Sequence, residues 1–182
     1  MNLNEKQLSA EYIYEGRVIK LRRDTALLPN GNTAIREVIE HNGGVCVAAL
    51  TEDDEMLFVR QFRYPYFETV LEIPAGKRDN ADEDPLECGI RELKEETGAV
   101  AEKFIPLGEL YPSPGYCGEI IWLFAATGLT FGEMDLDEDE FLNVERIPLE
   151  KAVQMILSGE IKDAKTQAAV LKVKILKDSG KI

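Results

Sequence analysis

Three glutamates, Glu92, Glu95 and Glu96, stand at spacings i, i+3 and i+4 within the segment RELKEET. On an α-helix with about 3.6 residues per turn they fall within an arc of roughly 100°, so three like charges share one face. A divalent cation held by the carboxylates would offset their repulsion. A solvent-exposed acidic face is the alternative, because it is the usual place of glutamates on a helix. The spacing thus indicates either a metal site or an exposed face.

The helix that carries these acids has well-marked ends in the sequence. Asp84 can cap it, Pro85 suits the first helical position, and Glu87 stands at capping-box spacing. Gly98 stands where a left-handed residue ends a helix. We therefore predict a helix over about residues 85–97.

The two sides of this predicted helix differ in polarity. A narrow apolar stripe lies nearly opposite to the acids and is formed by Leu86, Ile90, Leu93 and Thr97. We expect this stripe to face the core. Cys88 and Gly89 lie beside the acids and are small, which leaves room for ions and a ligand.

Runs rich in β-branched and aromatic residues lie on both sides of the helix, separated by turn residues. The predicted strands lie within 12–28, 33–41, 43–50, 56–63, 68–76, 104–112, 119–129 and 144–149. Two further helices are predicted at 149–158, ended by Gly159, and at 164–178. Strands first, a helix between strands and helices last indicate a mixed α+β layer architecture around one core.

The composition limits the kinds of partner. A formal net charge of −13 disfavours nucleic acid, because binding to its backbone relies on lysine and arginine. A phosphorylated small molecule remains compatible, because divalent cations bridge phosphates and carboxylates. No apolar run approaches the roughly 18 residues of a membrane span, and the N-terminus lacks a signal-peptide pattern. The three cysteines are odd in number and widely spaced, so we expect a cytoplasmic protein without disulfides.

The segment GKRDNADEDPLECGIRELKEETGA resembles the Nudix box, in which Gly, five residues, Glu and seven residues precede REUxEExGU, U being bulky and apolar. The matching positions are held by Gly76, Glu83, Arg91, Glu92, Leu93, Glu95, Glu96 and Gly98. Six residues instead of five separate Gly76 from Glu83, and the small Ala99 holds the last apolar position. The extra residue falls in a polar loop, where insertions are tolerated.

The resemblance covers about residues 12–170, including VRQFRYP, LEIPAGK, the SPG loop at 113–115, LDEDEF and SGEIKDAKT. These segments are similar to the Nudix subfamily of ADP-ribose pyrophosphatases and related sugar-nucleotide hydrolases. The resemblance implies an α/β/α sandwich of the α+β class, with a mixed sheet between helices. It also implies an N-terminal antiparallel β ribbon at residues 1–42, which contacts substrate and pairs two chains in a homodimer. The Nudix hydrolase domain would then span residues 43–182.

The resemblance further implies a reaction. It is Mg²⁺-dependent hydrolysis of the pyrophosphate of ADP-ribose to AMP and ribose 5-phosphate, with Mn²⁺ as a substitute metal. GDP-mannose is the alternative substrate, since DNADEDPLECGIR and GEIKDAKT also resemble the Nudix hydrolases that act on GDP-mannose. A noncatalytic nucleotide-sugar-binding regulator is the alternative from another class of protein.

Residue roles follow from the same resemblance. The implied metal ligands are Glu92, Glu96, Glu140 and, through its backbone carbonyl, Ala75. Glu95 supports the cluster as a catalytic residue, and Arg91 is expected to pair with Glu83. Glu138 is the predicted base that deprotonates the attacking water, and its role and that of Glu140 could be exchanged.

Substrate binding needs cations and polar groups outside the acidic zone. Arg63 and Arg36 are candidates for the phosphates or the terminal ribose, because guanidinium presents paired donors to phosphate. A structural ion pair is the alternative role of each arginine. Ser113 in the SPG loop and Glu119 just after that loop are the substrate contacts that the resemblance implies. No role follows for His41, the only histidine.

Overall fold

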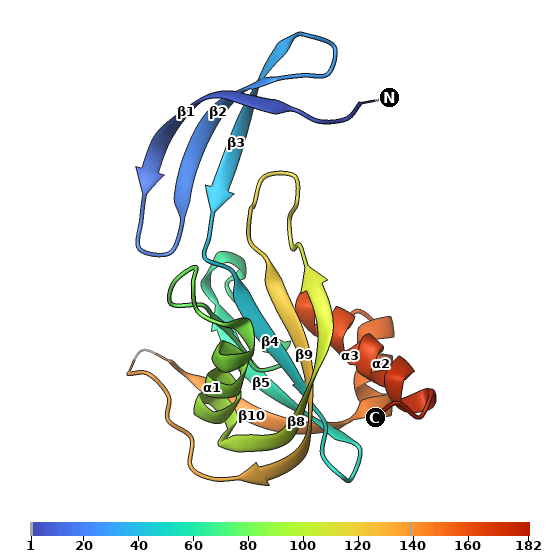
Figure 1. Ribbon diagram of the computed structural model, residues 1–182. Helices are drawn as coiled ribbons and strands as arrows, with labels where there is room; N and C mark the ends of the chain where they lie inside the picture. Colours follow the sequence, from blue (N-terminus) through green and yellow to red (C-terminus); the bar gives the residue numbers. More distant parts are fainter. Residues whose placement is uncertain (1, 139) are drawn as a thin grey trace.

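The computed structural model describes residues 2–138 and 140–182 of the chain. Figure 1 shows two parts, an N-terminal ribbon and a larger body that contains the helices. The body contains the strands β4 (Gly44–Ala49), β5 (Glu55–Arg63), β6 (Glu68–Glu72), β7 (Ala75–Lys77), β8 (Ala99–Leu110), β9 (Ile121–Phe131) and β10 (Leu142–Pro148). A short 3₁₀ turn at Tyr64–Tyr66 joins β5 to β6.

The ribbon consists of β1 (Lys6–Glu15), β2 (Lys20–Leu27) and β3 (Thr33–Glu40), all antiparallel. This confirms the predicted N-terminal antiparallel ribbon, although β1 begins earlier than predicted. Every residue of β1 is exposed, because the alternating polar and apolar side chains of this edge strand have no second layer to cover them. Two backbone hydrogen bonds tie the ribbon to the body: Ile39 N–H donates to the carbonyl of Tyr116 at 2.8 Å, and Gly118 N–H donates to the carbonyl of Ile39 at 2.9 Å.

The body is built on a mixed sheet in the order β7-β4-β9-β8. β4 pairs with β9 in parallel, and the other pairs are antiparallel. All six residues of β4 are buried, which fits its apolar sequence GVCVAA. A second, antiparallel sheet has the order β10-β5-β6. β8 begins at Ala99, earlier than predicted, because residues from Ala99 onward pair with the end of β9.

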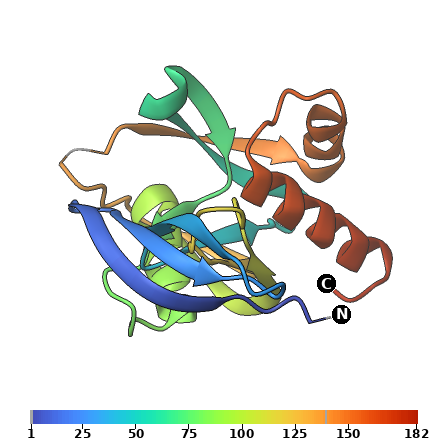
Figure 2. The same ribbon diagram turned by 90° about the horizontal axis from the view of Figure 1, so that it is seen from above.

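Helices cover both faces of the mixed sheet. α1 (Pro85–Thr97) lies on one side, and α2 (Leu149–Leu157) with α3 (Ala164–Asp178) lies on the other, as Figures 1 and 2 show. The α/β/α sandwich of the α+β class, with its mixed sheet between helices, is thereby confirmed. None of the helices formed by the described residues is long and apolar enough to cross a lipid bilayer.

All three helices follow the sequence prediction closely. The Asp84 carboxylate accepts hydrogen bonds from the backbone N–H groups of Leu86 and Glu87, and Gly98 ends α1 with φ of 68°. Asp163 caps α3 through Thr166 N–H. These ends were predictable because each cap depends on residues within one helical turn.

The predicted core-facing stripe of α1 is wrong at two positions. Leu86 and Ile90 are 38% and 44% exposed, whereas Cys88 and Gly89 are buried. A Cβ added at Gly89 would lie 3.3 Å from the Val47 side chain, so this face of the helix approaches the sheet closely. Small residues on this face bring the acids of α1 against the sheet as well.

Candidate active site

Glu92 and β7 meet at very close range. A Cβ added at Gly76 would lie 1.9–2.3 Å from the carboxyl atoms of Glu92, so only glycine lets the strand and this carboxylate approach in this way. On the next turn of α1, Glu96 accepts a hydrogen bond from Ala75 N–H at 2.9 Å. Two helix carboxylates and two consecutive residues of β7 therefore form one compact unit.

Burial perturbs both carboxylates. Glu96 is 2% exposed, and burial raises its pKa to about 8, although the hydrogen bond from Ala75 opposes the shift. Burial also raises the pKa of Glu92 to about 7, against the lowering effect of Arg91. Glu140 adds negative charge close to both groups. Such a cluster of carboxylates with raised pKa values favours binding a cation.

Arg91 organises the acids on its side of α1. Its guanidinium contacts Glu83 at 3.2 Å, Glu92 at 2.9 Å and Glu95 at 3.1 Å. The predicted pair with Glu83 is therefore confirmed. Glu83 in turn accepts a hydrogen bond from Asp79 N–H at 2.6 Å, which fixes the loop between β7 and α1. Arg91 thus joins that loop to the acid row and supports the acids.

The donor set fits a hard divalent cation, because carboxylate and carbonyl oxygens are the ligands that such ions prefer. Glu92, Glu96 and the Ala75 backbone are adjacent, which suits their predicted roles. In the described part of the chain, however, no three His, Cys, Asp or Glu side chains already converge on one point. The reason is visible in the contacts: Glu95 and Glu92 bind Arg91, and Glu96 binds a backbone N–H.

A cavity of about 530 Å³ lies over this unit. Acids from α1 and from the loop after β9 line one part of it, namely Glu92, Glu95, Asp137 and Glu140. Cations from the ribbon turn, β5, β7 and α1 line it as well, namely Arg17, Arg63, Lys77 and Arg91. The cavity therefore combines groups that bind a metal with groups that bind phosphate.

The two loop glutamates differ in position. Glu140 lines the 530 Å³ cavity, whereas Glu138 is exposed and does not line it. The loop that carries both is fixed to α1 by a hydrogen bond of 3.0 Å from Asp135 N–H to the carbonyl of Glu95. The structure thus brings Glu140 to the acid cluster, whereas Glu138 is an exposed residue outside the cavity lining.

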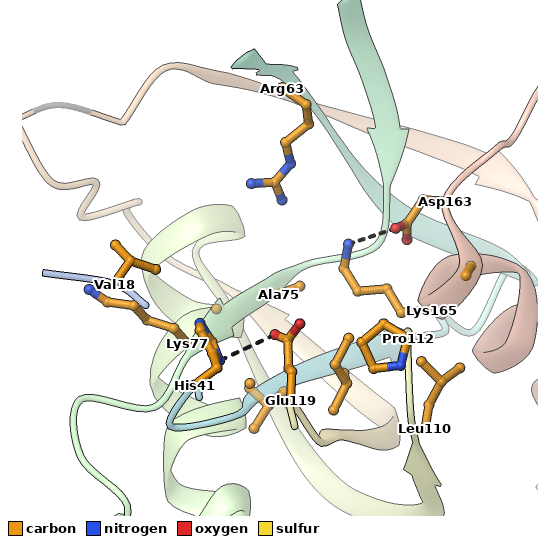
Figure 3. Close-up of a pocket in the computed structure, with 15 residues that line it drawn as sticks. Val18, His41, Arg63, Ala75, Lys77, Leu110, Pro112, Glu119, Asp163 and Lys165 are labelled. Atoms are coloured by element: carbon orange, nitrogen blue, oxygen red, sulfur yellow. Dashed lines mark ion pairs between the residues drawn. The ribbon is translucent and has the colours of Figure 1, made fainter. Parts of the chain in front are cut away.

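Two further cavities, each of about 370 Å³, adjoin the first one at Arg63, which lines all three. Figure 3 shows the first of them, with Glu119 and His41 on one side and Arg63 and Lys165 on the other. The Glu119 carboxylate lies 3.5 Å from His41 Nδ1. Ser113 lines the second cavity. Arg63, Ser113 and Glu119 therefore border one continuous cleft.

Arg36 lies apart from this cleft within the same chain. It is on β3, where its guanidinium donates to the Glu5 carboxylate at 2.9 and 2.7 Å. Both residues line a separate hollow at the turn that contains Pro29 and Asn30. Within one chain, Arg36 is therefore an ion-pair residue of the ribbon.

Sequence reasoning missed several residues of the cleft wall. Glu72, Asp163 and Lys165 form a charged cluster beside Arg63, and His41 faces Glu119. Glu72 gave one signal in the sequence, as a lone acid between the apolar residues of VLEIP. Its pairing with Lys165 gave none, because the two residues are 93 positions apart.

Comparison with known proteins identifies the family. Residues 40–170 match the NUDIX domain, and residues 5–39 match the nucleoside diphosphate sugar hydrolase N-terminal domain. The chain belongs to the Nudix family. It is an enzyme of the hydrolase type, and members of this Nudix family generally need a divalent metal ion.

Several relatives of this Nudix chain are similar over most of its length. The ADP-ribose pyrophosphatase of Bacillus subtilis (strain 168) is 42% identical over 171 residues, which cover 93% of this chain and 92% of that protein. The methanol dehydrogenase activator of Bacillus methanolicus is 43% identical over 168 residues, which cover 91% of this chain and 90% of that protein. The GDP-mannose pyrophosphatase of Yersinia enterocolitica is 37% identical over 142 residues, 72% of this chain and 73% of that protein.

A solved structure agrees with the Nudix fold of the whole chain. The crystal structure of an ADP compounds hydrolase superposes with a TM-score of 0.85 and covers 100% of both chains. At 23% sequence identity, this likeness concerns the fold.

Proposed function

We propose that this protein hydrolyses the pyrophosphate of ADP-ribose to AMP and ribose 5-phosphate in a Mg²⁺-dependent reaction. The observation that carries the proposal is the contact of Glu92 and Glu96 with β7 beneath a cavity that is also lined by arginine and lysine side chains. A pyrophosphate needs both, since its oxygens bind cations and its hydrolysis needs an activated water. ADP-ribose is favoured by the similarity to the Bacillus subtilis pyrophosphatase over 93% of the chain.

The acids have distinct parts in this proposal. Glu92, Glu96, Glu140 and the carbonyl of Ala75 hold Mg²⁺, which when bound neutralises phosphate oxygens and acidifies water. Mn²⁺, with similar ligand preferences, would substitute for it. Glu95 orients Arg91 and so helps to hold the acids of α1 in position. Glu138 accepts the proton of the attacking water. Support for Glu138 is its place two residues before Glu140, on the loop fixed to α1.

Substrate recognition falls to the cleft wall. Arg63 would bind the phosphates, while Ser113 and Glu119 would bind hydroxyl groups of the substrate on either side of Arg63. The three residues border connected cavities, which supports this division of roles.

We propose that residues 1–42 form a dimerisation ribbon, that the Nudix domain spans residues 43–182, and that the protein is a homodimer. The support is the exposure of β1 along its whole length, including Leu8, Tyr12 and Ile13. Arg36 would then contact substrate in the partner's cleft. Sedimentation at micromolar concentration tests this, and a monomer would refute it.

The location and the partners follow from the composition. The free thiol state of all three cysteines supports a cytoplasmic location, and the charge of −13 argues against nucleic acid as a partner.

The deciding experiment is a substrate panel with product identification. ADP-ribose, GDP-mannose, ADP-glucose, diadenosine polyphosphates and NADH are assayed with Mg²⁺, with Mn²⁺ and with EDTA. AMP and ribose 5-phosphate should be the best products. Faster turnover of GDP-mannose would favour the second candidate, which the similarity to the Yersinia protein supports. Binding of a nucleotide sugar with no turnover of any compound would favour a noncatalytic regulator.

A further inference from the structure

Arg63 belongs to a partly buried ionic cluster in the cleft wall, which also contains Glu72, Asp163 and Lys165. Glu72 is 2% exposed, and both of its oxygens are occupied: Arg63 Nε donates to Oε1 at 2.6 Å and Arg63 Nη2 to Oε2 at 2.8 Å. Lys165 Nζ donates to Oε2 as well and lies 3.1 Å from Asp163. Although burial raises it, these two cations hold the pKa of Glu72 below its ordinary value. Two cations and two carboxylates thus balance within the cluster.

The cluster leaves one part of Arg63 available. Nε and Nη2 are turned to Glu72, and within the described residues Nη1 donates to no atom. Figure 3 shows the guanidinium projecting into the open space of the cleft, with Lys165 to one side beside Asp163. Arg63 is therefore held by one edge of its planar fork and presents the other edge to a ligand.

Lys165 is placed to influence both the position of this guanidinium and the net charge of the cluster around it. Without Lys165, the Glu72 carboxylate would have Arg63 as its one cationic partner and would bind it more strongly. The cluster would change from neutral to a net charge of about −1, which opposes the approach of a phosphate.

The lysine is itself rigidly placed. It belongs to the first turn of α3, where Asp163 accepts hydrogen bonds from Thr166 N–H at 2.9 Å and from the Thr166 hydroxyl at 2.6 Å. The same hydroxyl accepts a hydrogen bond from Ile73 N–H at 3.0 Å, which fixes the helix start to the residue after Glu72. Lys165 and Glu72 are thus parts of one hydrogen-bonded framework.

We propose that Lys165, acting through Glu72, is a positioning residue that sets the orientation and charge environment of Arg63 for phosphate binding. This inference rests on the proposed function. By sharing the Glu72 carboxylate with Arg63, Lys165 weakens the grip of Glu72 on Arg63 and leaves the other edge of the guanidinium free for phosphate, without itself contacting the substrate.

The test compares Lys165→Met with a matched control on the same helix. Lys174 also bridges two carboxylates, those of Glu150 and Asp178, but it lies near the other end of α3 and away from the cleft. Lys165→Met should raise KM for ADP-ribose by about tenfold, because one charge-assisted hydrogen bond is weakened, with kcat changed less than twofold. Lys174→Met should leave both constants unchanged.

A double-mutant cycle separates positioning from direct binding. Arg63→Ala removes the group whose position depends on Lys165, so adding Lys165→Met to Arg63→Ala should raise KM by only about threefold or less, the remainder reflecting the lost positive charge. The same tenfold effect in both backgrounds would overturn the proposal, and so would equal KM values for Lys165→Met and wild type. Where the methionine variant does not fold, Lys165→Gln is put through the same cycle, because it keeps a donor in the buried site. Absence of turnover by the wild-type protein would instead refute the proposed function, so the two failures are distinguishable.

Discussion

Glu96 accepts a hydrogen bond from the backbone N–H of Ala75 at 2.9 Å, so the most deeply buried acid of α1 is joined directly to the strand that contributes the predicted carbonyl ligand. The bond fixes one carboxylate oxygen and the peptide plane before Ala75. Helix and strand therefore present their oxygen atoms as a unit, which is the arrangement that a metal ligand set requires.

Glu96→Gln should lower kcat/KM for ADP-ribose by about 100-fold or more. The change removes a ligand charge at nearly constant shape, and loss of even an indirect contact in a metal site costs about 10- to 100-fold. Steady-state kinetics at saturating Mg²⁺ measures the effect. Glu87→Gln, on the exposed side of α1, is the control and should behave like wild type. Near-normal turnover of Glu96→Gln would show that the metal assignment is wrong.

Removal of divalent metal should make stability depend on pH in a defined direction. Glu92 and Glu96 have pKa values of about 7 and about 8, above the ordinary 4.5, so the folded state binds their protons more tightly than the unfolded state. Their stabilising contribution is complete below pH 4.5 and is lost as the pH rises through about 7 and about 8. In EDTA, Tm should therefore fall over this range.

Mg²⁺ should reverse that loss, because it binds the ionised carboxylates. The difference in Tm between Mg²⁺ and EDTA should be larger at about pH 9 than at about pH 6. Glu92→Gln combined with Glu96→Gln removes both titrating groups and should flatten the dependence. A Mg²⁺ effect that decreases with rising pH would contradict this account.

Gly76→Ala should impair both stability and activity. The new Cβ would overlap the Glu92 carboxyl, whose atoms lie 1.9–2.3 Å from its ideal position, so the side chain or the strand must move. Overpacking of this kind costs about 1–3 kcal/mol. Urea unfolding and Mg²⁺ titration of activity measure the two effects. Gly132→Ala serves as the comparison, because its Cβ would meet nothing closer than 3.8 Å. Equal behaviour of the two variants would argue against close packing of Glu92 on β7.

Glu138→Gln and Glu140→Gln should have different kinetic signatures. Glu138, which is exposed, is the proposed base, so its loss should lower kcat by about 100-fold or more and leave the Mg²⁺ dependence unchanged. Glu140 lines the cavity beside Glu92, so its loss should raise the Mg²⁺ concentration needed for half-maximal activity. Rate measurements across a Mg²⁺ series distinguish the two. Exchanged signatures would assign the base to Glu140.

Local sequence signals predicted α1 and its acids well. Asp84 and Gly98 end the helix through contacts within one turn, and Glu92 and Glu96 lie on the same face because helical spacing requires it. The predicted core stripe was right at Leu93 and wrong at Leu86 and Ile90, because close contact between helix and sheet selected the small residues Cys88 and Gly89. Such contact depends on the partner surface, which helical periodicity does not contain.

Contacts between distant segments could not be predicted from the sequence. Lys165 and Glu72 meet only because α3 packs at the end of β6, and neither residue has a distinctive local pattern. The exposed position of Glu138 relative to Glu140 depends on how the loop after β9 is tied to α1. For both features the determining partner lies in another element of the fold.

The two backbone bonds of Ile39 make the ribbon and the loop at residues 113–118 one mechanical unit. A ligand that orders this loop therefore also orders the ribbon, and a second chain that orders the ribbon also orders the loop. By thermodynamic reciprocity, each would raise the affinity of the other by the same factor. If the proposed homodimer forms, dilution of the protein would therefore lower its affinity for substrate, and a high substrate concentration would keep the two chains associated at protein concentrations where they would otherwise separate.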